Sequence, residues 1–141
     1  MPFGLDRMRL VMSPKKLILT PFHKALSSLE AILKLEKNEV QRDATIQRFK
    51  HCYEMAWKMM KRHLEWVGTT DVNLYSKRDL FREAAKAGLL SNPEAWFEYN
   101  DARNLTSHAY EESAAEQVYA MAKKIFVDAK DLLTKLQKHH A

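Results

Sequence analysis

A four-three alternation of apolar residues near the end of the chain is the feature that most limits the folds available to it. Steps of four and three residues return a side chain to nearly the same side of an α-helix. The alternating residues are Val118, Ala122, Ile125, Ala129, Leu132 and Leu136. A second apolar row recurs every seven residues and consists of Tyr119, Phe126 and Leu133. Such a wide apolar face suits a deeply buried helix or a helix that also contacts a partner.

The composition favours helices along the rest of the chain as well. Only 3 Gly and 4 Pro occur in 141 residues, so the turn residues that a many-stranded sheet needs are scarce. A content of 46% hydrophobic and 29% charged residues is typical of a globular domain with a real core. The sequence therefore predicts an all-α fold.

Helix-start and helix-stop signals divide the chain into successive helices. The expected helices cover residues 21–37, 43–67, 76–87, 93–103 and 113–136, with caps at Thr20, Ser76, Asn92 and Ser113 and stops at Gly68 and Gly88. Pro21 would break any helix that continued from an earlier start. We therefore predict an up-and-down antiparallel bundle of four to five helices forming one domain over residues 20–138, preceded by an arm or short extra element over residues 1–19.

Charge and cysteine content indicate the surroundings of the chain only broadly. The formal net charge of +5 favours acidic partners such as RNA, although lysines on the solvent-exposed faces of helices give the same total. Part of this charge lies in a basic arm that carries Arg7, Arg9, Lys15 and Lys16. The single Cys52 cannot form an internal disulfide, so a reducing cytoplasm is the expected compartment. No apolar run resembles a signal peptide or reaches membrane-spanning length, so we expect no membrane partner.

Several common kinds of site are not predicted. The three glycines are too scattered for a P-loop or a dinucleotide-binding turn, so no cofactor is expected. His23, His51 and His63 lack a second ligand at helical spacing, and no metal site is predicted. His139 and His140 are expected to be frayed and solvated at the end of the last helix.

The run from Arg103 to Tyr110 is where the residue types indicate chemistry. An arginine can hold a phosphate through a planar fork of donors, and a histidine can transfer protons near neutral pH. Positions 103 and 108 lie about 140° apart on a straight helix, so Arg103 and His108 converge only if the helix ends or bends between them, or if the long arginine reaches around it. The structural alternative pairs Arg103 with Asp101 or Glu94, uses His108 as a cap and packs Tyr110 on the bundle.

Three segments together resemble a known family. They are Phe49 to Lys58, Arg78 to Leu90 and Arg103 to Tyr110, and the similarity extends over residues 20–137. In this combination the chain resembles the nucleotidyltransferase substrate-binding protein family, which belongs to the HEPN superfamily of small helical bundles. The resemblance implies a homodimer that assembles with a minimal nucleotidyltransferase encoded nearby.

The resemblance also implies roles for four residues. Many HEPN relatives are metal-independent ribonuclease toxins that use an Arg and a His spaced as Arg103 and His108 are. By correspondence Arg103 would steady the scissile phosphate of RNA, Asn104 would orient it and His108 would act as general base or acid. Tyr110 would accept AMP from the partner, which silences the nuclease.

The same resemblance leaves a noncatalytic alternative open. The family name describes a subunit that presents a substrate to a two-chain nucleotidyltransferase. Glu54, Trp57 and Lys58 could belong to such a binding face, although Trp57 is more simply a core residue and Glu54 with Lys58 a helical i,i+4 pair.

Overall fold

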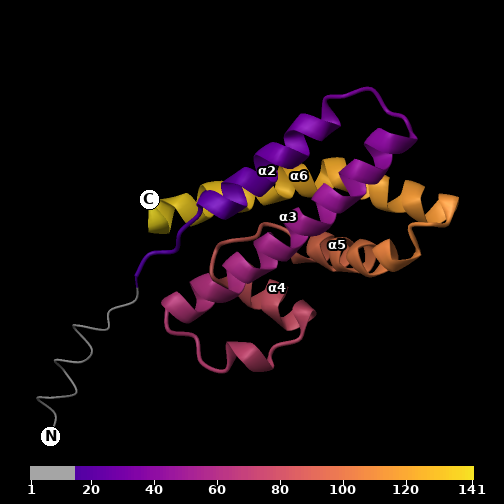
Figure 1. Ribbon diagram of the computed structural model, residues 1–141. Helices are drawn as coiled ribbons and strands as arrows, with labels where there is room; N and C mark the ends of the chain where they lie inside the picture. The colour runs from indigo at the N-terminus through magenta and orange to yellow at the C-terminus, as the bar shows by residue number, and fades with distance from the viewer. Residues whose placement is uncertain (1–14) are drawn as a thin grey trace, which may run out of the picture.

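The computed structural model describes residues 15–141, which form helices joined by short turns (Figure 1). The α-helices are α2 (Thr20–Leu33), α3 (Glu39–Trp66), α4 (Lys77–Lys86), α5 (Pro93–Leu105) and α6 (Glu112–His140), and the 3-10 helices are η1 (Val72–Leu74) and η2 (Thr106–His108). No strand occurs within this range, which confirms the all-α prediction. None of the described helices is long and apolar enough to cross a membrane. The basic arm predicted at Arg7 and Arg9 lies outside the described residues, so the division into arm and bundle domain stays a prediction.

Helix α3 runs through the middle of an antiparallel bundle and contacts each of the other α-helices. Helices α2, α3, α5 and α6 run alternately in opposite directions, and the shorter α4 lies between α3 and α5 in the chain (Figure 1). The end of α6 lies beside the start of α2, so the two ends of the described chain meet.

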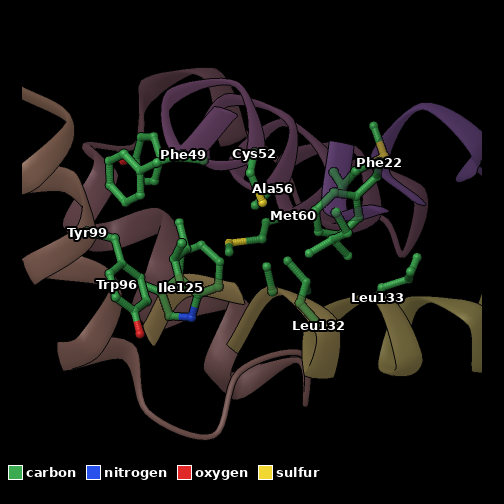
Figure 2. Close-up of a cluster of buried hydrophobic side chains, with 14 of the residues drawn as sticks. Phe22, Phe49, Cys52, Ala56, Met60, Trp96, Tyr99, Ile125, Leu132 and Leu133 are labelled. Carbon is green, nitrogen blue, oxygen red and sulfur yellow. The ribbon is translucent and has the colours of Figure 1, made fainter. Parts of the chain in front are cut away.

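The core consists of apolar side chains contributed by every α-helix. On α6 the residues of the four-three alternation have no exposed surface, which confirms the predicted helix face: Val118, Ala122, Ile125, Ala129, Leu132 and Leu136. Figure 2 shows Ile125 and Leu132 facing Met60 of α3 and Phe22 of α2. In the second row Leu133 is buried, whereas Tyr119 and Phe126 are half-buried. That row is therefore shared between the core and the surface.

Several helix boundaries differ from those expected. Helix α3 begins at Glu39 rather than near Asp43, because the Asn38 side chain accepts a hydrogen bond from the Gln41 amide at 2.8 Å and caps the helix earlier. Helix α2 ends at Leu33, not at residue 37, and Thr20 is its first residue while Leu19 holds the capping position.

At the other helix ends, some of the predicted caps are observed and one is not. Ser76 caps α4 by accepting a hydrogen bond from the Asp79 amide at 3.1 Å. Gly68 and Gly88 have φ angles of +93° and +83°, the left-handed conformation expected where α3 and α4 end. The Ser113 capping box is wrong, because α6 begins at Glu112 and Glu111 holds the capping position without a side-chain hydrogen bond.

The end of α6 is helical rather than frayed, and of the two terminal histidines predicted to be solvated only His139 is exposed. The His140 side chain is buried, and its Nδ1 accepts a hydrogen bond from the Leu17 amide at 3.0 Å. His140 Nε2 lies 2.9 Å from Nδ1 of buried His63. Because the Leu17 N–H must donate, His140 carries its proton on Nε2 and donates to His63. The imidazoles therefore fasten the segment before α2 to the ends of α3 and α6.

This histidine pair predicts that stability falls in mild acid. Burial, followed by the charges of His139 and His140, lowers the pKa of His63 from its ordinary value of 6.5 to about 4. Between pH 6.5 and pH 4 the unfolded chain therefore binds a proton at His63 that the folded chain does not bind. The contribution of neutral His63 to the free energy of unfolding is complete above pH 6.5 and is lost as the pH falls toward 4. We expect the free energy of unfolding, measured by chemical denaturation, to fall between about pH 7 and pH 5 by about 2 kcal/mol more in wild type than in His63→Gln.

The matched control for this measurement is His51→Gln, which removes an exposed histidine from the same helix. It is expected to keep the wild-type pH profile. Parallel profiles for wild type and His63→Gln would contradict the prediction.

Candidate functional site

The run from Arg103 to Tyr110 forms a corner between α5 and α6. Helix α5 ends at Leu105, η2 follows, and two backbone hydrogen bonds tighten the turn, from the Ala109 amide to the Thr106 carbonyl at 3.2 Å and from the Glu111 amide to the His108 carbonyl at 2.9 Å. Arg103 thus lies in the last turn of α5, and His108 lies beyond its end. The helix therefore ends between these residues, one of the arrangements that would let them converge.

Arg103 is half-buried and is held from two sides. Its Nε donates to Glu54 Oε1 on α3 at 3.0 Å, and its Nη1 donates to Thr106 Oγ1 at 3.2 Å. The Thr106 hydroxyl donates in turn to the Arg103 carbonyl at 2.6 Å. The alternative that paired Arg103 with Asp101 or Glu94 is therefore wrong, since the carboxylate that binds it comes from another helix.

Glu54 uses both of its carboxylate oxygens. Oε2 accepts a hydrogen bond from Trp57 Nε1 at 3.0 Å, while Oε1 is bound to Arg103. The Lys77 ammonium of α4 lies 3.8 Å from the centroid of the Trp57 ring, a cation–π distance. Glu54 therefore pairs with Arg103 and Trp57, not with Lys58 as the helical spacing suggested, and half-buried Trp57 is more than a core residue.

His108 and Tyr110 lie together on the open side of the corner. Their ring centroids are 6.2 Å apart, and the Tyr110 side chain is 80% exposed. Asn104 is also exposed. The packing of Tyr110 on the bundle that the structural alternative required is not observed. Among the described residues the structure records no hydrogen bond between Arg103 and His108, so the corner holds an anchored arginine and an exposed His–Tyr pair.

Two phenols cross-link the helices that carry this corner. Tyr53 of α3 donates to Asn100 Oδ1 of α5 at 2.6 Å. Tyr99 of α5 donates a very short hydrogen bond to Asp128 of α6. Burial raises the pKa of both phenols above the ordinary tyrosine range, assisted at Tyr99 by its hydrogen bond to Asp128. Both groups remain protonated donors near neutral pH, so they fix α5 against its neighbours.

Arg42 fastens the other side of the corner, where α6 begins. Its guanidinium donates to Glu112 at 2.5 Å and to Glu116 at 3.2 Å, and these bonds raise the pKa of this arginine above its ordinary value. Lys37 and Arg42 together lower the pKa of Glu116 below the usual carboxyl value. The start of α6 is thereby tied to the start of α3.

The corner is an open surface rather than a closed pocket. A neighbouring hollow of about 380 Å³ lies between α5 and α6, and its lining includes Leu105 and Gln117 but neither Arg103 nor His108. In the described part of the chain no group of three or more His, Cys, Asp or Glu side chains is placed to hold a metal ion. An extended ligand reaching the corner from solvent suits this shape better than an enclosed small molecule.

Comparison with known proteins identifies the family. Residues 17–138 match the family described as nucleotidyltransferase substrate binding protein like. A Haemophilus influenzae protein named probable ribonuclease HepT is 37% identical over 97 residues, which are 67% of this chain and 66% of that relative, just under two thirds of its length.

Two solved structures share the fold. One, from Haemophilus influenzae and described as the fold of a substrate binding domain of a nucleotidyltransferase, gives a TM-score of 0.75 at 32% identity over 85% of this chain and 99% of that one. The other, from Thermus thermophilus, gives a TM-score of 0.70 at 29% identity over 82% of this chain and 98% of that one. The chain therefore belongs to the nucleotidyltransferase substrate-binding protein family, within the HEPN superfamily, as the sequence motifs indicated.

Sequence reasoning missed two residues of the site. The sequence patterns did not single out Thr106, yet its hydroxyl both accepts from and donates to Arg103. Glu54 lies 49 positions before Arg103 in the chain, and its spacing to Lys58 suggested a different partner. A local pattern carries no signal for a contact between two helices, although Glu54 does lie in one of the segments that resembled the family.

Proposed function

We propose that this protein is a HEPN-type partner of a minimal nucleotidyltransferase and acts as a metal-independent ribonuclease toxin. The observation that carries the proposal is the corner itself, which holds an anchored guanidinium together with an exposed imidazole and phenol. The name of the ribonuclease relative and the net charge of +5 support the same substrate class.

The chemistry expected is transesterification of RNA. His108 removes the proton of a ribose 2′-hydroxyl, whose oxygen forms a bond to the adjacent phosphorus while the bond from phosphorus to the 5′-oxygen breaks. The products are a 2′,3′-cyclic phosphate and a 5′-hydroxyl, which takes up a proton. Arg103 stabilises the charge that develops on the phosphate, and exposed Asn104 orients it.

Dimerisation would complete such a site. In the proposed homodimer two corners face one cleft, so that one RNA strand meets two copies of Arg103 and His108. The half-buried aromatic rings of Tyr119 and Phe126 on α6 offer surface to a second copy. A nucleotidyltransferase would then approach Tyr110 from solvent.

The nuclease role predicts a metal-independent activity that requires His108. Purified protein lacking AMP is expected to cleave RNA in EDTA, and His108→Ala should lower the rate by at least about 100-fold, because the general base is removed. Gel analysis of end-labelled RNA measures the rate and detects the cyclic phosphate. Exposed His51, changed to Ala, is the matched control and should leave the rate unchanged. Equal cleavage by wild type and His108→Ala would refute the nuclease role.

The regulatory role predicts a modification at Tyr110. With ATP and the nucleotidyltransferase encoded nearby, the phenolic oxygen attacks the α-phosphorus, forms a phosphodiester with AMP and releases pyrophosphate. Intact mass spectrometry should show added AMP that Tyr110→Phe abolishes, together with loss of cleavage in the modified protein. Tyr75→Phe is a suitable control, because this half-buried tyrosine lies in the turn before α4. An unmodified mass beside an active partner would count against this role.

A noncatalytic substrate-binding subunit is the second candidate. It is favoured by the description of the similar Haemophilus influenzae structure and by half-buried Trp57 with Lys77 over its ring, an arrangement that could bind a small substrate. This role predicts a stable complex that changes the partner's affinity for that substrate, with no RNA turnover by either modified or unmodified protein.

A further inference from the structure

We propose that Glu54 and Trp57 together position Arg103. Glu54 holds the guanidinium through one hydrogen bond, and Trp57 keeps the second carboxylate oxygen from forming another, so that the guanidinium stays available for phosphate. This inference rests on the proposed function, because it concerns how Arg103 is presented to RNA. Neither residue is assigned a part in the reaction itself. Both act through the arginine.

The hydrogen bonds of Arg103 divide its guanidinium into a held part and an available part. Glu54 binds Nε and Thr106 binds Nη1, each through one oxygen. Within the described residues these are the recorded bonds of the group, so Nη2 and the second hydrogen of Nη1 are left to bind phosphate. The arginine is thus oriented without being saturated.

A carboxylate beside an arginine commonly adopts the fork-to-fork arrangement, in which both oxygens accept from the guanidinium. Here that arrangement is not formed, and the second oxygen accepts from Trp57 Nε1 at 3.0 Å instead. Trp57 lies three residues after Glu54, on the next turn of α3, and Lys77 packs over the face of its ring. The indole therefore holds Oε2 away from Nη2.

Glu54 must also be an acceptor at both oxygens. Its two partners, Arg103 Nε and Trp57 Nε1, are both donors. An amide in place of the carboxylate could satisfy only one of them, because its NH₂ group would face a donor at the other. Glu54→Gln therefore weakens the hold on Arg103 while preserving shape, because it removes the negative charge and one of the two acceptors, and Glu54→Asp keeps two acceptors on a shorter side chain.

The two positions predict different kinetic defects. The weaker hold in Glu54→Gln should lower kcat by about 10- to 100-fold, because a misplaced arginine no longer matches the transition state. Glu54→Asp should retain more activity than Glu54→Gln. In Trp57→Phe the carboxylate is free to turn both oxygens toward Arg103 and to compete with phosphate, so KM should rise about 3- to 10-fold with a smaller change in kcat. Glu65→Gln, an exposed site on the same helix, is the control.

A second measurement follows Arg103 directly and does not depend on cleavage. Its Nε–H should give a slowly exchanging cross-peak in a ¹H–¹⁵N spectrum, assigned by its loss in Arg103→Lys. The peak should exchange rapidly in Glu54→Gln and stay protected in Trp57→Phe and Glu65→Gln. A Glu54→Gln protein with wild-type kcat and a protected Nε–H would overturn the proposal, as would an unchanged KM in Trp57→Phe. If wild type cleaves no RNA, the proposed function fails, while the exchange rate still supports or overturns the hold of Glu54 on Arg103.

Discussion

The burial of α3 is the constraint on which the other features of this structure depend. Phe49, Cys52, Ala56 and Met60 on this helix have no exposed surface, and the helix contacts every other α-helix of the bundle. A close-packed interior leaves such a helix little freedom to rotate or slide. Polar side chains at its margins, Glu54 among them, are consequently held at fixed places against α5 and α6.

Polar side chains near the corner join each pair of helices among α3, α5 and α6. Tyr53 joins α3 to α5, Tyr99 joins α5 to α6, and Arg42 joins α3 to α6. A single hydrogen bond of this kind contributes only about 1 kcal/mol, so together they add less than the apolar core does. Their effect is on geometry, because they fix the relative positions of α3, which carries Glu54, and of α5 and α6, which meet at the corner.

Patterns that repeat along one helix could be predicted from the sequence, and contacts between helices could not. The buried face of α6 and the left-handed glycines after α3 and α4 follow from spacing and from backbone sterics. The prediction that His140 is solvated was wrong, because solvation is the default expectation for a residue near a chain end. Only the fold brings Leu17 and His63 to the His140 ring. Glu54 was misassigned for the same reason, since its partner lies on another helix.

The corner also separates its two reactive groups by how they are held. Arg103 belongs to the ordered end of α5 and is tied to α3, whereas His108 and Tyr110 stand exposed in the turn that follows. In the proposed function the fixed arginine would define where a phosphate binds, and the imidazole would adjust to the bound strand. An AMP group on Tyr110 would then add bulk and one negative charge directly beside His108. Because 80% of the Tyr110 side chain is already in solvent, this modification would block the site without disturbing the core.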